Sequence, residues 1–358
     1  MQPVFNKESS KEVKGFAILM LLAYHLFESA ELIHTTGVDY RPFPLEGFLT
    51  FAGFGNVCVS VFVFLTAYGI TTGLYRQEGI SIGDAYRQAS KRFLRLMLQF
   101  MALFISVNVL WGFIFDYDKL YGMNKQGMLH LLTDATGFSQ FFDTPTMNMT
   151  WWYMKVAYIL IFLIPVLYFA VRKIGYPMLL IAFFLPFAVS MDKDIQRYFF
   201  VAVFGVCAAY GMWPDKLFNL KIKPVLKWLF GIVLLIVCVL VRQNYVVYQT
   251  YVAYVDAPIA LFLVYFACQV LGSIPVLRKL LGFIGKHSMN IYLVHTFFYM
   301  SLWREFIYSF RYAGLIFIAL LVTTLLYSVV LEFIKNNVFR KIFLKIYNRH
   351  CKNKGNVT

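Results

Sequence analysis

The chain consists of long apolar runs separated by short polar segments. Ten runs approach or exceed the roughly 20 mostly apolar residues that a membrane-spanning helix needs. They are continuous rather than alternating, which favours helices over a barrel. We therefore predict an all-α, polytopic membrane protein with about ten transmembrane helices, of which the fifth and ninth are the shortest. The runs cover about 14–34, 51–74, 93–115, 151–171, 176–191, 196–213, 225–242, 250–271, 287–303 and 312–334.

The distribution of Lys and Arg predicts the orientation. If the N-terminus is cytoplasmic and ten helices alternate, about three quarters of the 33 Lys and Arg residues fall on the inside, as the positive-inside rule expects. Losing one helix would invert every later loop and spoil this asymmetry. We therefore predict that both termini are cytoplasmic, including a tail of about 336–358, and that the protein lies in the plasma (inner) membrane.

Composition agrees with a membrane protein and excludes other classes. Hydrophobic residues make up 60% of the chain and charged residues 14%, against roughly 25% charged in soluble domains. The net charge of +15 lies in short loops rather than on one face, so we expect no nucleic-acid partner. Four of the five cysteines lie in apolar runs and none forms a C-x-x-C pair, so we expect no metal site. No linker interrupts residues 1–358, which we interpret as one domain.

The first apolar run follows three lysines and lacks the short apolar core and small-residue cleavage site of a signal peptide. We expect it to be a retained helix. The longest loop, about 116–150, is predicted to lie outside. Loops of this length are uncommon without a function. A functional loop and a helix lying in the membrane interface are both compatible with its sequence.

Ionisable side chains inside apolar runs are costly and are usually functional. His25 lies eleven residues after Lys14, roughly 16 Å deeper at a rise of about 1.5 Å per residue. That depth is close to the middle of a hydrocarbon core about 30 Å thick. A histidine there can act as a general base, and Glu28, three residues on, shares its helix face. A histidine that only bonds a neighbouring helix would look the same in sequence.

Two arginines precede the third run. Arg92 and Arg95 are three residues apart and share a face at the predicted cytoplasmic end of that helix. Paired guanidinium groups suit a phosphate-rich ligand. An anchor that obeys the positive-inside rule is the simpler interpretation of this pair when it is taken alone.

Other polar or aromatic residues lie at the predicted outer ends of helices. Trp152 and Tyr153 begin the fourth run, where an aromatic belt would explain them. Lys155 lies one turn further in, and Asp256 begins the eighth run, so we predict that the two pair across an opening for substrate. His295 lies in the ninth run and either lines the site or braces helix packing.

Five segments, in this order, resemble acyltransferase family 3, a family of bacterial multi-helix membrane enzymes that acylate surface sugars. Lys14 and His25 stand where the family has a basic residue eleven positions before a histidine. Lysine replaces the commoner arginine, and Thr66-Ala67 replaces the usual Ser-Gly pair. No esterase-like domain is appended, so we expect catalysis in the membrane part. The segments are KGFAILMLLAYH, SVFVFLTAYGI, RFLRL, TWWYMKVAYILIFLIP and GKHSMNIYLVHTFF.

The resemblance implies an O-acyltransferase, with O-acetyl transfer as the default. Cytoplasmic acyl-CoA, the donor substrate, would place its phosphates near Arg92, Arg95 and Lys14, and no tightly bound cofactor is expected. The acceptor would be a hydroxyl of a cell-surface or lipid-linked polysaccharide. His25 would take the hydroxyl proton or carry the acyl group itself, and the sequence leaves both open.

Two other functions fit part of the pattern. Ten helices with mid-membrane ionisable residues also suit a proton-coupled transporter or exporter of a glycan. The sequence lacks the internal repeat that many transporters show. A membrane scaffold without chemistry is the second alternative, and the residues His25, Arg92 and Arg95 argue modestly against it. The sequence is compatible with a homodimer.

Overall fold

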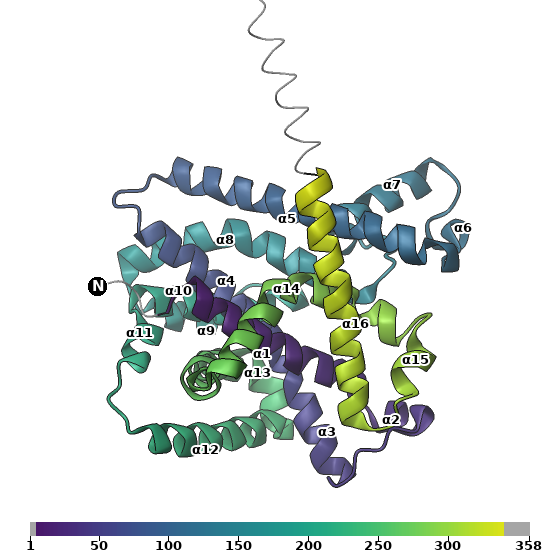
Figure 1. Ribbon diagram of the computed structural model, residues 1–358. Coiled ribbons are helices and arrows are strands. Elements are labelled where there is room, and N and C mark those ends of the chain that lie inside the picture. Colours follow the sequence, from purple (N-terminus) through teal and green to yellow (C-terminus); the bar gives the residue numbers. More distant parts are fainter. Residues whose placement is uncertain (1–4, 340–358) are drawn as a thin grey trace, which may run out of the picture.

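The computed structural model describes residues 5–339 and is built of helices, joined by short turns and 3-10 or π segments (Figure 1). Within these residues there is no named strand, only an isolated bridge between Asp39 and Tyr312. The prediction of an all-α fold is therefore confirmed. The α-helices are α1 Lys7–Leu26, α2 Ala30–Thr36, α3 Leu45–Phe54, α4 Cys58–Tyr75, α5 Ile82–Trp111, α6 Tyr117–Tyr121, α7 Lys125–Ala135, α8 Tyr153–Ile174, α9 Met178–Ala188, α10 Lys193–Tyr210, α11 Trp213–Phe218, α12 Pro224–Gln243, α13 Val252–Tyr265, α14 Pro275–Tyr299, α15 Arg304–Tyr308 and α16 Ala313–Ile334.

Each of the ten predicted runs overlaps a helix of the structure. Six helical segments within the described residues are long and apolar enough to cross a membrane, and a seventh qualifies if a bent pair is counted as one span. These helices point to a polytopic membrane protein. The count of ten spans and the location of the termini stay predictions, and most of the predicted tail, 336–358, lies outside the described residues.

The first predicted helix, 14–34, is wrong as a single element. Helix α1 ends at Leu26, and α2 starts after a break and leaves at an angle of 72°. Ser29 causes the restart, because its side chain accepts a hydrogen bond from the backbone N–H of Leu32 and so caps a new helix. His25 consequently lies in the last turn of α1 rather than in the middle of a continuous span.

Three other boundaries differ from the sequence prediction. Helix α5 begins at Ile82, before the predicted start at 93, because Ser81 caps it by accepting from the N–H of Asp84. Helix α9 has 11 residues, roughly 16 Å, which is too short to cross a core of about 30 Å by itself. Helix α14 has 25 residues and starts with Pro275 at a position that favours helix initiation, well before the predicted 287.

Helices α1 and α14 lie side by side in the middle of the molecule, whereas α5 and α12 lie at opposite edges (Figure 1). Two glycines, Gly15 on α1 and Gly285 on α14, allow the backbones of these two helices to come into contact. A methyl group on Gly285 would lie 2.8 Å from the backbone nitrogen of Gly15, and one on Gly15 would collide with the carbonyl of Leu281. Small residues allow such close approach between membrane helices, where van der Waals packing drives association.

The long loop 116–150 is folded around a buried carboxylate. Asp134 accepts hydrogen bonds from the hydroxyl of Tyr121 and the backbone N–H of Met147, at 2.7 and 2.8 Å, and burial raises its pKa. Helix α7, within this loop, exposes apolar side chains such as Met128 and Leu132. An exposed apolar face fits a helix that lies in the membrane interface.

The glycine contact predicts opposite effects for two similar substitutions. Gly285→Ala should lower the thermal unfolding midpoint of the detergent-solubilised protein, because overpacking costs about 1–3 kcal/mol. Gly282→Ala, on the same helix but with open space around it, should leave the midpoint unchanged or raise it, since alanine favours helix by about 1 kcal/mol. Equal midpoints for the two variants would contradict the proposed packing.

Candidate active site

His25 and Glu28 lie where α1 ends. The Nδ1 atom of His25 is 3.6 Å from a carboxylate oxygen of Glu28, which is beyond hydrogen-bond range but close enough for electrostatic attraction. The His25 side chain is 20% exposed, so a substrate can reach it. The hydroxyl of Tyr308 donates to the carbonyl of Leu26, one of the carbonyls that a helix end leaves without a partner.

His295 of α14 lies directly against His25. The two ring centroids are 4.9 Å apart, and the ring of Tyr299 packs beside both, with its centroid 6.0 Å from that of His295 and 6.5 Å from that of His25. The Nδ1 atom of His295 is 2.7 Å from the carbonyl oxygen of Tyr292. A carbonyl can only accept, so Nδ1 carries the proton and Nε2 of the neutral ring is a hydrogen-bond acceptor. That Nε2 atom is buried and has no hydrogen-bond partner among the described residues.

The segment before α8 holds the turn of α14 that carries His295. The indole N–H of Trp151 donates to the carbonyl of Leu293 at 2.8 Å. The side-chain amide of Asn148 donates to the hydroxyl of Thr296 at 2.6 Å. Because these bonds flank His295 on both sides, they fix the position of its ring relative to α8.

Trp152 and Tyr153 do not contact His25 in the structure. Trp152 stacks on Tyr198 of α10, and the ring of Tyr153 packs against Tyr292 with centroids 5.5 Å apart. Tyr292 in turn lies beside His295. These aromatic residues therefore form a wall next to the histidine pair.

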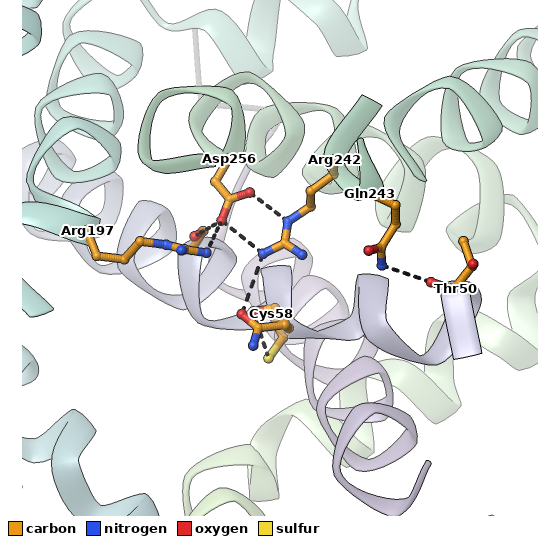
Figure 2. Close-up of polar contacts among 8 residues, drawn as sticks. Thr50, Cys58, Arg197, Arg242, Gln243 and Asp256 are labelled. Carbon is orange, nitrogen blue, oxygen red and sulfur yellow. Dashed lines mark hydrogen bonds and ion pairs between the residues drawn. The ribbon is translucent and has the colours of Figure 1, made fainter. Parts of the chain in front are cut away.

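The predicted pairing of Lys155 with Asp256 is wrong. Lys155 reaches outward from α8 to two carboxylates in the segment that begins α10, Asp192 at 3.0 Å and Asp194 at 2.8 Å. Asp256 is fully buried and is bound instead by Arg242 (Figure 2). The two predicted partners already have closer counter-charges on neighbouring helices.

Asp256 is the centre of a buried polar cluster. Arg242 binds both of its carboxylate oxygens, at 2.7 and 3.3 Å, and Ser60 donates to one of them at 2.8 Å. Arg197 approaches from α10 at 3.5 Å (Figure 2). Neither arginine was among the predicted site residues, because both fall at the ends of apolar runs. The high cost of charge within a membrane is the signal that could have found them.

The three basic residues predicted to bind acyl-CoA lie on two helices. Arg92 and Arg95 share a face of α5, within the helix rather than in a loop. Arg92 is half-buried beside Gly73 of α4, and Arg95 is exposed. Lys14 lies on α1, three turns before His25.

Comparison with known proteins identifies the family. The family model described as an acyltransferase domain, of acyltransferase family 3, matches residues 13–333, nearly the whole chain. The chain belongs to this acyltransferase family. Neither the curated proteins nor the solved structures include a match to the acyltransferase.

The geometry places the imidazole of His25 beside the carboxylate of Glu28 and the ring of His295. Within the described residues, no group of three or more His, Cys, Asp or Glu side chains is arranged to hold a metal ion. His25 is accessible and lies beside a carboxylate. Its ring also packs against a second imidazole, whose Nε2 atom has no hydrogen-bond partner among the described residues. This arrangement suits proton transfer from a hydroxyl group.

The buried cluster predicts a large loss of stability when one charge is removed. Asp256→Asn leaves Arg242 buried without a counter-charge, which typically costs about 3–5 kcal/mol. We expect a clearly lower thermal unfolding midpoint, and partial recovery when Arg242→Met is added. Asp118→Asn, an exposed position, is the matched control and should be neutral. A neutral Asp256→Asn would show that the cluster contributes little to stability.

Proposed function

We propose that the protein is a membrane-embedded O-acyltransferase of the bacterial inner membrane. It moves an acyl group, acetyl in the simplest case, from cytoplasmic acyl-CoA to a hydroxyl of a cell-surface or lipid-linked polysaccharide. The family membership supports acyl transfer, and the contact between His25 and His295 is the observation that carries the proposal. This pair unites the N-terminal helix with the second-last long helix, and the Nε2 atom of His295 has no hydrogen-bond partner among the described residues.

In the proposed reaction His25 acts as general base. It takes the proton of the acceptor hydroxyl while the hydroxyl oxygen attacks the thioester carbonyl. The carbon–sulfur bond breaks, and the CoA thiolate leaves and receives the proton from the imidazolium. Glu28 and the carbonyl end of α1 stabilise the positive charge that forms on His25.

The role proposed for His295 is to position the reacting groups. Its Nε2 lone pair can accept a hydrogen bond from the far N–H of His25 or from the acceptor hydroxyl. The hydrogen bond between its Nδ1 atom and the carbonyl of Tyr292 orients the ring, and the bonds to Leu293 and Thr296 hold its helix turn, so the ring is already oriented before the substrates bind.

The phosphates of the donor are proposed to bind Arg92 and Arg95 of α5 together with Lys14 of α1. The half-buried position of Arg92 supports this assignment, because a guanidinium group away from water binds phosphate more strongly than an exposed one. The aromatic wall of Trp152, Tyr153 and Tyr198 is proposed to border the opposite, acceptor side of the site.

The role of His25 can be tested with the purified protein in vesicles. His25→Ala should lower the rate of acetyl transfer from acetyl-CoA to de-O-acylated cell-surface polysaccharide by at least about a hundredfold, because a positioned base contributes roughly that much. His34→Ala, an exposed histidine on α2, is the matched control and should keep full activity. Acetyl-CoA affinity and the unfolding midpoint should stay unchanged. Near wild-type turnover by His25→Ala would refute the proposal.

The arginines predict a separate effect on the donor. Arg92→Ala and Arg95→Ala should each weaken acetyl-CoA binding, by about tenfold if one charged hydrogen bond of roughly 1.4 kcal/mol is lost. Lys91→Ala, an exposed cation on the same helix, serves as the control. Calorimetry with acetyl-CoA and with dephospho-CoA would show which phosphate is bound. An unchanged dissociation constant for acetyl-CoA would refute this role and would favour the interpretation that the arginines are membrane anchors.

A further inference from the structure

The buried cluster around Asp256 contains more positive than negative charge. Arg197 and Arg242 approach its carboxylate from opposite sides, at 3.5 and 2.7 Å (Figure 2). Within residues 5–339, no second carboxylate forms an ion pair with either arginine. One positive charge is therefore unbalanced, in a place where burial makes an uncompensated charge costly.

Both arginines also have nitrogen atoms that donate no hydrogen bond. The Nε atom of Arg197 and the Nη1 atom of Arg242 are buried, and neither has a partner in the part of the chain that the structure describes. A buried donor without an acceptor costs free energy, and the cost is larger when the donor belongs to a charged group. A bound oxyanion would supply both the acceptor oxygens and the missing negative charge.

Arg197 makes the cluster accessible. Its side chain is 26% exposed, whereas that of Arg242 is 0% exposed, so a ligand that approaches from outside the bundle meets Arg197 first. Arg197 lies near the start of α10, about one turn beyond Asp192 and Asp194, which bind Lys155 of α8. Lys155 belongs to the turn of α8 that begins with the aromatic wall. Arg197 therefore lies on the side of the bundle proposed above for the acceptor.

A row of four packed aromatic rings connects Arg197 with His295. The guanidinium carbon of Arg197 lies 5.9 Å from the ring centroid of Tyr198, at one end of the row, and Tyr292, at the other end, lies beside His295. Neighbouring rings along the row have centroids 5.5 to 6.0 Å apart. The cluster and the histidine pair thus border the same aromatic wall. The row consists of Tyr198, Trp152, Tyr153 and Tyr292.

Arg242 is connected with the same site through Asn56. Its Nη2 atom is 3.5 Å from the side-chain oxygen of Asn56. Gly55, the preceding residue, packs so closely on α1 that an added methyl group would lie 3.0 Å from the Cβ atom of Tyr24. The rings of Tyr24 and His25 have centroids 4.9 Å apart. Both arginines therefore lie within a few side chains of the histidine pair.

We infer that Arg197 and Arg242 bind a singly charged oxyanion of the acceptor, either the carboxylate of an acidic sugar or a phosphodiester between sugars. The inference rests on the proposed acyl transfer only in identifying this ligand as the acceptor. One negative charge balances the cluster, and guanidinium groups bind carboxylate and phosphate oxygens through paired hydrogen bonds. A neutral glycan would leave the excess charge uncompensated. The acceptor is thereby narrowed to an anionic polysaccharide.

Arg197 allows a test that spares the fold. Arg197→Gln removes the excess charge and leaves Arg242 and Asp256 as a one-to-one pair, so the thermal unfolding midpoint should change little. Arg197→Lys keeps the charge but loses the paired donors. Lys193→Gln removes an exposed cation four residues earlier on the same helix face and is the matched control. General attraction between opposite charges would make Arg197→Gln and Lys193→Gln equally weak binders.

Binding is measured by fluorescence anisotropy with the detergent-solubilised full chain and labelled, de-O-acylated cell-surface polysaccharide. We expect about tenfold weaker binding by Arg197→Gln, an intermediate loss by Arg197→Lys and no loss by Lys193→Gln, because one charged hydrogen bond contributes roughly that factor. Equal affinity of wild type and Arg197→Gln for the untreated polysaccharide would overturn the proposal, and so would equal losses in Arg197→Gln and Lys193→Gln.

Two treatments of the polysaccharide distinguish the sources of the oxyanion. Reduction of carboxyl groups to alcohols should remove the difference between wild type and Arg197→Gln if the ligand is a carboxylate. Cleavage with hydrofluoric acid should remove that difference if the ligand is a phosphodiester. If the difference survives both treatments, the ligand is not an oxyanion of the polysaccharide and the proposal fails.

The kinetics of acetyl transfer separate the anion site from the proposed chemistry. Arg197→Gln should raise the KM for the polysaccharide about tenfold and leave kcat and the KM for acetyl-CoA unchanged, because the arginine binds the acceptor away from the reacting atoms. Anion-dependent binding without any acetyl transfer by wild type would sustain the site and refute the proposed enzyme function. Equally efficient transfer to the untreated polysaccharide and to one freed of both kinds of anion would refute the role of the anion in acceptor recognition.

Discussion

The backbone contact between α1 and α14 is the constraint on which the candidate site depends. Gly15 and Gly285 let the two helices approach without side chains between them. Any larger residue would push the helices apart, and imidazole rings that now lie 4.9 Å apart would separate with them. Two histidines 270 positions apart in sequence therefore depend on two glycines that take no part in chemistry. Packing of this kind fixes geometry more firmly than a loop could.

A second constraint is the buried ion pair between α12 and α13. The pair of Arg242 and Asp256 is fully buried, and burying charges costs free energy that their attraction only partly offsets. Such a pair adds little to the stability of the fold. It favours one arrangement of the two helices, because separating the partners would leave each charge buried without a counter-charge. It joins α12 to α13, and α12 otherwise exposes most of its apolar side chains. The cluster is thus what holds a peripheral helix in a defined position.

The sequence was sufficient to predict the helical fold, and the predictions that failed did so for specific reasons. Hydropathy located all ten apolar segments. It does not indicate that Ser29 caps a new helix, which bends the chain after His25. Periodicity placed Glu28 beside His25, because that contact is local. The neighbour of His25 across the bundle was uncertain and the pairing of Lys155 was wrong, because contacts between distant helices depend on packing that no local pattern encodes.

The end of α1 links these features into one site. A helix that ends inside the bundle leaves carbonyls and a change of direction where a continuous span would present only side chains. His25 lies in that last turn, with His295 of α14 packed against its ring. The proposed reaction needs a place where an acyl donor and an acceptor hydroxyl can meet at one base. Hydropathy alone predicts one continuous span here. The break between α1 and α2 instead ends the first helix just after His25 and so leaves room for such a meeting.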